Sequence, residues 1–274
     1  MFVQHALTFK QRVGVIPVAI DANTTHGCET EMKLIAAQIF PVPGEYEKNI
    51  AKHIEVIHMA AGQGGNLVVF PELSLTGYEP RLAKALAVHP SDSRLDEFQR
   101  LSDRYGILIA VGAPTQGSKG TEISMISFQP GRERTSYSKQ HLHSDELPFF
   151  TPGTRKLVLR QAEVVLAPAI CYESLQPWHA EEAAESGAQV YLASVAKSER
   201  GTASANRHYP IIAKKHSMTV VMANCLGPAD DFVAAGCSAI WDSQGDMVCS
   251  ADAVQEALVV YDIKTGDASI IKLA

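Results

Sequence analysis

Short apolar runs alternate with amphipathic segments along most of this chain. The clearest run covers residues 164–170. It is bounded by polar residues and is too short for a buried helix, so it predicts a buried strand. Further strands are expected at residues 33–38, 67–70, 107–111, 190–193, 219–223, 238–241 and 257–262. Residues 123–128 and 135–138 predict the two strands of a hairpin, with a turn near residues 130–131.

Helical periodicity appears between several of these runs. Residues 46–62 and 94–105 place apolar side chains on one face, with charged residues between them. Gly106 follows the second segment and is a typical helix stop. Residues 177–185 and 211–217 predict two more helices. Because strands and helices alternate without a repeat or an evident linker, we expect one layered α/β domain.

Residues 1–31 depart from this pattern. Lys10 and Arg12 precede a short apolar patch that Pro17 interrupts. The patch resembles a secretory signal only faintly, since no convincing small-residue cleavage site follows it. We therefore expect residues 1–31 to form a loosely attached extension and residues 32–274 to form the folded domain.

Composition narrows the class of protein. The chain has 274 residues, of which 46% are hydrophobic and 20% are charged, which suits one large domain with a substantial core. The net charge of -6 argues against a nucleic-acid partner, because such surfaces need clustered Lys and Arg. No apolar run reaches the roughly 18 residues that a membrane span needs, so no membrane partner is expected.

Cysteine and histidine usage bears on the compartment and on metals. The five cysteines are an odd number and show no Cys-x-x-Cys spacing. A disulfide framework and a structural zinc site are therefore not expected, and a reducing cytoplasm is the simplest setting. His141 and His143 stand two residues apart, but no third ligand of suitable spacing is evident, so we expect no metal.

Three residues that suit catalysis follow predicted strands. Glu72, Lys139 and Cys171 each stand at the carboxyl end of such a strand. In layered α/β folds, ligands collect beyond the carboxyl ends of strands, so the three side chains are expected to meet in one pocket. Cys171 also precedes a predicted helix, and the unpaired N–H groups and partial positive charge there favour a thiolate.

These residue types suit acyl transfer. The thiol attacks a carbonyl or nitrile carbon, and the carboxylate moves the thiol proton to the leaving nitrogen. The ammonium group and a backbone N–H stabilise the oxyanion. Water that the carboxylate has deprotonated then frees the thioester. The pattern therefore indicates a cysteine enzyme.

Three segments that contain these residues resemble, in the same order, the motif blocks of the nitrilase, or carbon–nitrogen hydrolase, superfamily. They are Phe-Pro-Glu-Leu-Ser-Leu-Thr-Gly-Tyr at residues 70–78, Tyr-Ser-Lys-Gln-His-Leu at 137–142 and Ile-Cys-Tyr-Glu at 170–173. The resemblance extends from residue 32 to about residue 264. It implies a four-layer αββα sandwich, a homodimer or larger homo-oligomer, and catalytic roles for the carboxylate, the ammonium group and the thiol.

The same resemblance implies supporting residues. Glu146 precedes Phe-Thr-Pro-Gly at residues 150–153 and corresponds to a second glutamate that holds the lysine, with Asp145 as a substitute. The backbone N–H of Tyr172 is the expected oxyanion donor. Further candidates for the pocket are Tyr78, His141, Glu173 and Ser194. For Glu173, an equally weighted alternative is a purely structural position at the start of the helix.

One segment departs from the family. Many relatives have Asn-Pro near the end of the strand after the cysteine block, whereas residues 192–198 here are Leu-Ala-Ser-Val-Ala-Lys-Ser. Since that loop is expected to line the pocket, the choice of substrate cannot be carried over. Arg207 is a candidate for binding a substrate carboxylate, and an exposed position at a helix start is its alternative role.

The leading hypothesis is a cofactor-free amidase. It would release ammonia or an amine from a small amide or carbamoyl compound through a thioester on Cys171. A nitrilase is the alternative within the family, but that branch favours Trp directly after the cysteine, where Tyr172 stands here. A non-catalytic binding protein on the same fold is the third hypothesis, and the intact set of Glu, Lys and Cys argues against it.

Overall fold

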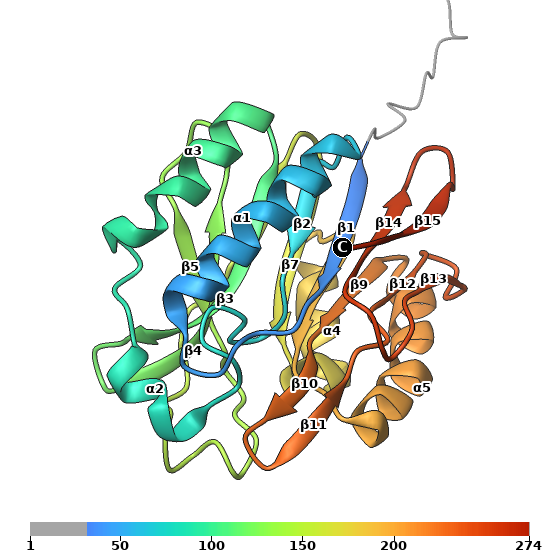
Figure 1. Ribbon diagram of the computed structural model, residues 1–274. Helices are drawn as coiled ribbons and strands as arrows, with labels where there is room; N and C mark the ends of the chain where they lie inside the picture. Colours follow the sequence, from blue (N-terminus) through green and yellow to red (C-terminus); the bar gives the residue numbers. More distant parts are fainter. Residues whose placement is uncertain (1–31, 274) are drawn as a thin grey trace, which may run out of the picture.

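The computed structural model describes residues 32–273, so the extension predicted for residues 1–31 lies outside the described residues. Two large β-sheets dominate it (Figure 1). The strands of the first are β1 (Lys33–Gln38), β2 (Leu67–Val69), β3 (Leu108–Gln116), β4 (Thr121–Phe128), β5 (Thr135–Ser138), β14 (Ala257–Asp262) and β15 (Ala268–Lys272). They are ordered β15-β14-β1-β2-β3-β4-β5.

The second large sheet has six strands. They are β6 (Leu159–Gln161), β7 (Val164–Ile170), β8 (Val190–Val195), β9 (Thr219–Asn224), β12 (Ala239–Trp241) and β13 (Met247–Ser250). Their order is β13-β12-β9-β8-β7-β6. A separate hairpin of β10 (Leu226–Ala229) and β11 (Phe232–Ala235) follows β9 along the chain.

Helices cover the outer faces of both large sheets (Figure 1). The helices of residues 32–273 are α1 (Tyr46–Gly62), α2 (Pro80–Leu86), α3 (Asp96–Tyr105), α4 (Pro177–Glu185) and α5 (Glu199–His216), with short 3-10 turns η1 (Ser93–Leu95) and η2 (Glu173–Leu175). Among them, α1 and α3 pack on the first sheet, and α4 and α5 pack on the second. The order of layers is therefore helix, sheet, sheet, helix, which is the predicted αββα sandwich in one domain.

Three apolar cores separate these four layers. One fills the space between the two sheets, with Leu34 and Val69 from the first and Leu166 and Val221 from the second. Another lies between the first sheet and helices α1 and α3, and the last lies between the second sheet and helices α4 and α5. Both faces of each central strand are thus buried, which explains why β7 reads as an unbroken apolar run.

The strand directions bring the predicted residues to one region. Strands β1, β2 and β3 are parallel, and β5 shares their direction because two antiparallel pairings separate it from β3. In the second sheet, β7, β8 and β9 are parallel. Glu72 follows β2, Lys139 follows β5 and Cys171 follows β7, so each stands at a carboxyl end.

Several elements differ from the sequence-based expectation. The helix predicted at residues 211–217 begins earlier, at Glu199. The apolar pattern did not reveal its first half, because the buried face there consists of small or partly polar residues such as Thr202, Ala205 and Tyr209. Strand β3 continues to Gln116, five residues beyond its predicted end. Helix α2 and strands β6, β10, β11, β13 and β15 were not predicted. All of these are short segments without a clear apolar period.

Candidate active site

Lys139 lies between two buried carboxylates. Its Nζ atom is 2.8 Å from Glu72 Oε1 and 2.6 Å from Glu146 Oε1. The Lys139 side chain has no exposed surface, and both glutamates are buried as well. A buried charge requires a partner, and here one ammonium group serves two carboxylates. The structure therefore brings together Glu72, Lys139 and Glu146.

Glu146 is fixed by three donors. Besides Lys139, the hydroxyl of Tyr78 donates a hydrogen bond to Glu146 Oε1 at 2.9 Å. The backbone N–H of His143 donates to Glu146 Oε2 at 2.7 Å. Asp145 instead pairs with the His143 ring at 2.6 Å and is exposed, so the glutamate and not the aspartate holds the lysine.

Cys171 stands on a sharp turn after β7. Its φ of 44° lies in the left-handed region, which a non-glycine residue adopts at an energetic cost. The backbone N–H of Cys171 donates to Ser194 O at 3.0 Å, which ties the turn to the end of β8. Its side chain is only partly buried. Strained backbone of this kind concentrates at functional sites.

The protonation equilibria of the site follow from burial and from neighbouring charges. Burial raises the pKa of Glu72 to about 7, with Lys139 opposing the rise and Glu146 adding to it. Burial also raises the pKa of the Cys171 thiol to about 11, so the thiolate expected from the following helix is not favoured in the structure. For Lys139, burial disfavours the charge, but the carboxylates prevail and raise its pKa. At neutral pH the site therefore holds a thiol, an ammonium group and a carboxylate near its pKa.

One oxygen of Glu72 remains available. Glu72 Oε1 accepts from Lys139, whereas Oε2 is buried and makes no hydrogen bond within the part of the chain that the structure describes. A buried polar atom without a partner is rare and calls for an explanation. The neighbouring Cys171 thiol also lowers the pKa of Glu72, against the larger effect of burial. Glu72 is therefore a candidate acceptor for the thiol proton.

A cavity of about 230 Å³ is lined by Cys171 and Lys139, whereas Glu72 contacts Lys139 but does not itself line the cavity. Its walls include the predicted residues Tyr78, Lys139, Glu146, Cys171 and Tyr172, and also Asp145, the expected substitute for Glu146. Leu175 and Phe232 add apolar surface. The volume suits a small molecule with a few heavy atoms, held against the thiol by a largely preformed wall.

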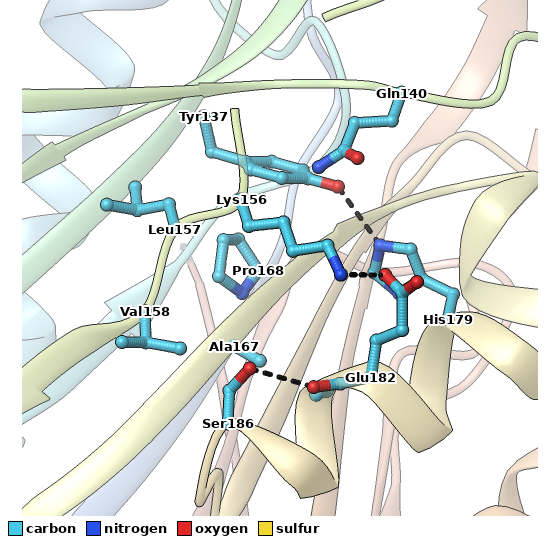
Figure 2. A pocket seen from close by; sticks show the side chains of 11 residues that line it. Tyr137, Gln140, Lys156, Leu157, Val158, Ala167, Pro168, His179, Glu182 and Ser186 are labelled. Atoms are coloured by element: carbon cyan, nitrogen blue, oxygen red, sulfur yellow. Dashed lines mark hydrogen bonds and ion pairs between the residues drawn. The ribbon is translucent and has the colours of Figure 1, made fainter. Parts of the chain in front are cut away.

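A second cavity lies nearby but carries different chemistry. It has a volume of about 160 Å³ and lies between α4, the end of β7 and residues 156–158. Figure 2 shows the hydroxyl of Tyr137 bonded to His179 at 3.0 Å and Lys156 paired with Glu182 at 2.9 Å. No thiol lines it, so the candidate active site is the cavity at Cys171.

Comparison with known proteins decides the family. The family model of carbon–nitrogen hydrolases matches residues 34–272. The chain belongs to the carbon–nitrogen hydrolase family. An amidase from Nesterenkonia sp. has a similar solved structure, with a TM-score of 0.77 and 25% sequence identity over 84% of this chain and 89% of that one.

Two curated relatives of this hydrolase are similar in sequence. An (R)-stereoselective amidase from Pseudomonas sp. is 24% identical over 80% of this chain and 81% of its own length. A glutamine-dependent NAD(+) synthetase from Thermotoga maritima is 24% identical over 85% of this chain. The hydrolase spans less than half of that synthetase, 42% of its length.

Glu173 does not line the cavity of the hydrolase, contrary to one expectation. Its Oε1 accepts from the Tyr137 hydroxyl at 2.7 Å and from the Ile170 N–H at 2.9 Å. Its Oε2 accepts from the backbone N–H of Gln140 at 2.8 Å. The side chain therefore ties the loop after β5 to the end of β7, and it turns away from the cavity because both oxygens are used. It also opens the short turn η2, whereas the predicted helix begins only at Pro177, so its role is structural but not at the start of that helix.

His141, Ser194 and Arg207 likewise lie outside the cavity wall. The His141 ring packs against Trp178 with ring centroids 4.2 Å apart. The Ser194 hydroxyl donates to Phe70 O at 2.8 Å, because its position on β8 directs it toward the other sheet. Arg207 is exposed, as its alternative role expected, but it lies in the middle of α5 and not at a helix start. Apolar patterns in a sequence do not give the direction of a side chain, which is why these three candidates were expected at the cavity but do not line it.

Lys197 was not predicted as a site residue. Its Nζ atom is 3.8 Å from Cys171 Sγ and 3.5 Å from Cys171 O, and it lines the cavity. Lys197 falls two residues after β8, in the segment that departs from many relatives. The position lies beyond the carboxyl end of β8, where layered α/β folds collect ligands.

Neither a metal site nor a membrane helix is found in residues 32–273. No group of three or more His, Cys, Asp and Glu side chains in that range is arranged to hold a metal ion. No helix in the same range is long and apolar enough to cross a membrane.

Gly112 on β3 provides a test of how the Glu72 loop is held. A Cβ atom at Gly112 would meet Pro71 O at 2.3 Å and Leu73 N at 2.5 Å, which no rotamer change relieves. We expect Gly112→Ala to displace Glu72 and to lower kcat/KM by about 10². We also expect a loss of about 1–3 kcal/mol in stability. Kinetics with an active amide and urea unfolding measure the two effects.

Gly62 is the matched control for this substitution. It ends α1, and a Cβ atom there would meet nothing within 4 Å. Gly62→Ala should leave kcat/KM unchanged and alter stability by less than about 1 kcal/mol. Equal effects of the two substitutions would show that the contact of β3 with the Glu72 loop is unimportant.

Proposed function

We propose that this hydrolase cleaves the carbon–nitrogen bond of a small amide or carbamoyl compound through a thioester on Cys171. The observation that carries the proposal is Lys139, which is held between two buried carboxylates and lines the same cavity as a thiol on a strained turn. The similarity to an amidase from Nesterenkonia sp. and to an (R)-stereoselective amidase supports amides as the substrate class.

In the first half of the proposed reaction, Glu72 accepts the proton of the Cys171 thiol as sulfur attacks the carbonyl carbon. The oxyanion forms near the Lys139 ammonium group and the backbone N–H of Tyr172, which stabilise it. Glu72 then returns the proton to the nitrogen as the carbon–nitrogen bond breaks. Ammonia or an amine leaves, and the acyl group remains on sulfur.

The second half repeats this chemistry with water. Glu72 takes a proton from water, whose oxygen attacks the thioester carbon. The same donors hold the oxyanion, and collapse of the intermediate releases the acid and the Cys171 thiolate. The proton on Glu72 returns to sulfur, which restores the starting state. Glu146 keeps Lys139 charged and oriented throughout.

Glutamine is a second candidate substrate. The relevant observation is the similarity to a glutamine-dependent NAD(+) synthetase over 85% of this chain. Since the chain matches only 42% of that protein, the proposal is limited to hydrolysis of the glutamine side-chain amide. Glutamine therefore belongs in the substrate screen beside simple amides.

Nitrile hydrolysis and simple binding are the rival functions. A screen of small amides, carbamoyl compounds, nitriles and glutamine for ammonia release separates them, with Cys171→Ala as the control. We expect ammonia from amides or carbamoyl compounds and none from the variant. Release from nitriles alone would replace amidase by nitrilase, and no release from any compound would favour a binding protein. The homo-oligomeric assembly and cytoplasmic setting also remain proposals.

The pH dependence of the reaction should reflect Glu72. Because the base works as a carboxylate and its pKa is raised to about 7, kcat/KM is expected to rise as the pH increases through about 7. Glu146 contributes to the raised pKa of Glu72 through like charge. The variant Glu146→Gln should therefore shift the acidic limb to lower pH, by roughly one unit. Profiles of kcat/KM between about pH 5 and pH 9 measure this, and an upward shift would contradict it.

A further inference from the structure

Three hydrogen bonds fix the backbone of Lys197. The backbone N–H of Lys197 donates to Asn224 Oδ1 at 2.8 Å. Its carbonyl oxygen accepts from Asn224 Nδ2 at 3.0 Å and from the Ala235 N–H at 2.9 Å. Asn224 is fully buried, so these bonds are protected from water. The position of Lys197 is therefore fixed by β9 and β11 together.

The aliphatic part of the Lys197 side chain packs beside Gly201, and the residue lines the cavity. It passes over Gly201 in the first turn of α5, where a Cβ atom would meet Lys197 Cβ at 3.0 Å and Cγ at 3.3 Å. Only 5% of Lys197 is exposed. The absence of a side chain at Gly201 leaves room for the lysine stem, which ends at the nucleophile.

The two lysines of the cavity differ in their partners. Lys139 Nζ contacts two carboxylates, whereas Lys197 Nζ makes no ion pair with any carboxylate within residues 32–273. The acceptors nearest to Lys197 Nζ are Cys171 O at 3.5 Å and Cys171 Sγ at 3.8 Å. These are long contacts, and an ammonium group has three protons to donate. A buried ammonium group is unfavourable when no anion pairs with it.

The surroundings of Lys197 favour an anion. Ser198 caps α5, an 18-residue helix, and both Ser198 and Gly201 line the cavity. The start of a helix adds partial positive charge at the same place. The carboxylates that line the cavity already have partners, because Glu146 pairs with Lys139 and Asp145 pairs with His143. An incoming anion therefore meets an uncompensated cation beside the sulfur.

We propose that Lys197, together with the start of α5, binds a carboxylate of the substrate, so that the preferred substrates are amides whose acyl group also carries a carboxylate. This inference rests on the proposed function. With Nζ at 3.8 Å from the sulfur, a carboxylate in hydrogen-bond contact lies within about 7 Å of it. A short acyl chain spans that distance, as in the monoamides of small dicarboxylic acids or in glutamine.

A role limited to the thiol makes a different prediction. The same ammonium group also stabilises a thiolate, which would speed the reaction of charged and uncharged amides equally. A bound carboxylate instead changes the preference between them. The ratio of kcat/KM for a charged and an uncharged amide therefore separates the two roles, because any effect on the thiol cancels in it.

The test compares matched amides. Succinamate and glutaramate carry the carboxylate, and 4-oxopentanamide and 5-oxohexanamide carry a methyl ketone in its place. We expect the wild-type protein to prefer the charged member of a pair, and Lys197→Met to lower that preference by about thirtyfold or more, mainly through KM. Lys119→Met, at an exposed lysine in the loop between β3 and β4, is the matched control and should keep the wild-type preference.

Alkylation of Cys171 gives a readout that needs no turnover. The rate ratio for iodoacetate over iodoacetamide should fall by about tenfold in Lys197→Met, because only iodoacetate carries a carboxylate. If Lys197→Met does not fold, Gly201→Ala, which keeps the charge but displaces the stem, should lower both ratios.

Unchanged ratios in the folded variants would overturn the proposal. A fall in the alkylation ratio of a protein that hydrolyses no amide would support anion binding by Lys197 and would refute the proposed amidase activity. The two ideas therefore fail in distinguishable ways.

Discussion

Replacing Lys139 with methionine is expected to abolish hydrolysis and to destabilise the fold. The substitution leaves two buried carboxylates facing each other without the ammonium group that now contacts both. Breaking a buried ion pair by removing one partner costs about 3–5 kcal/mol. Loss of an oxyanion-stabilising group lowers the rate by about 10²–10³ or more. Urea unfolding at pH 8 and kinetics with an active amide measure the two losses.

A second substitution separates charge from packing. In Lys139→Met combined with Glu146→Gln, one of the two uncompensated carboxylates is gone, so a large part of the lost stability should return while activity stays absent. If Lys139→Met unfolds at the same urea concentration as the wild-type protein, the buried cluster does not stabilise the fold. If it keeps near wild-type activity, Lys139 has no part in the reaction.

The second large effect is expected for Glu72→Gln. Glutamine has the same shape but cannot accept a proton, and both halves of the proposed reaction require that acceptance. We expect kcat/KM to fall by about 10²–10⁴, the usual contribution of a general base. The fold should remain intact, because Lys139 keeps its bond to Glu146. Ammonia release and thermal unfolding of the variant measure these effects.

Slower reaction of the thiol should accompany the loss of activity. Glu72 is the nearby acceptor for the proton of Cys171, so iodoacetamide should label the thiol of Glu72→Gln more slowly than that of the wild-type protein. A matched control is Glu133→Gln, at an exposed glutamate in the turn between β4 and β5. Retention of more than about a tenth of the activity in Glu72→Gln would exclude the carboxylate as the essential base.

The layers of the fold and the cluster of Glu72, Lys139 and Cys171 were accessible from the sequence. Apolar runs marked β2 and β7, and a hairpin pattern marked β5. Lys139 and Cys171 directly follow their strands, and Glu72 stands three residues beyond β2. Parallel strands end at the same edge of a sheet, so three strand ends were enough to expect one pocket. Family resemblance added Glu146, whose three donors are visible only in three dimensions.

The directions of individual side chains could not be predicted in this way. Glu173 and Ser194 lie next to the site in the sequence or in the sheet, yet they point elsewhere. The turn at Cys171 has a positive φ, and Ser194 faces the opposite sheet. Lys197 owes its position to Asn224 and Ala235, which lie 27 and more residues further along the chain. Such contacts follow from the assembled fold and leave no local pattern.

Helix α5 illustrates a further limit. Its first half contains Gly201, Thr202, Ser204 and Asn206, which are poor helix formers or typical loop residues, and Pro210 lies inside it. Packing of Ala205, Tyr209 and Ile212 against the second sheet overrides these preferences. The same helix start then borders the cavity.

Trapping the acylated enzyme tests the central claim most directly. The protein is mixed with an active amide, quenched in acid within one turnover, digested and analysed by mass spectrometry. The account predicts that the peptide containing Cys171 gains the mass of the acyl group, and that Cys171→Ser shows no stable adduct of this kind. An active protein whose Cys171 stays unmodified, or an adduct on another cysteine, would contradict it.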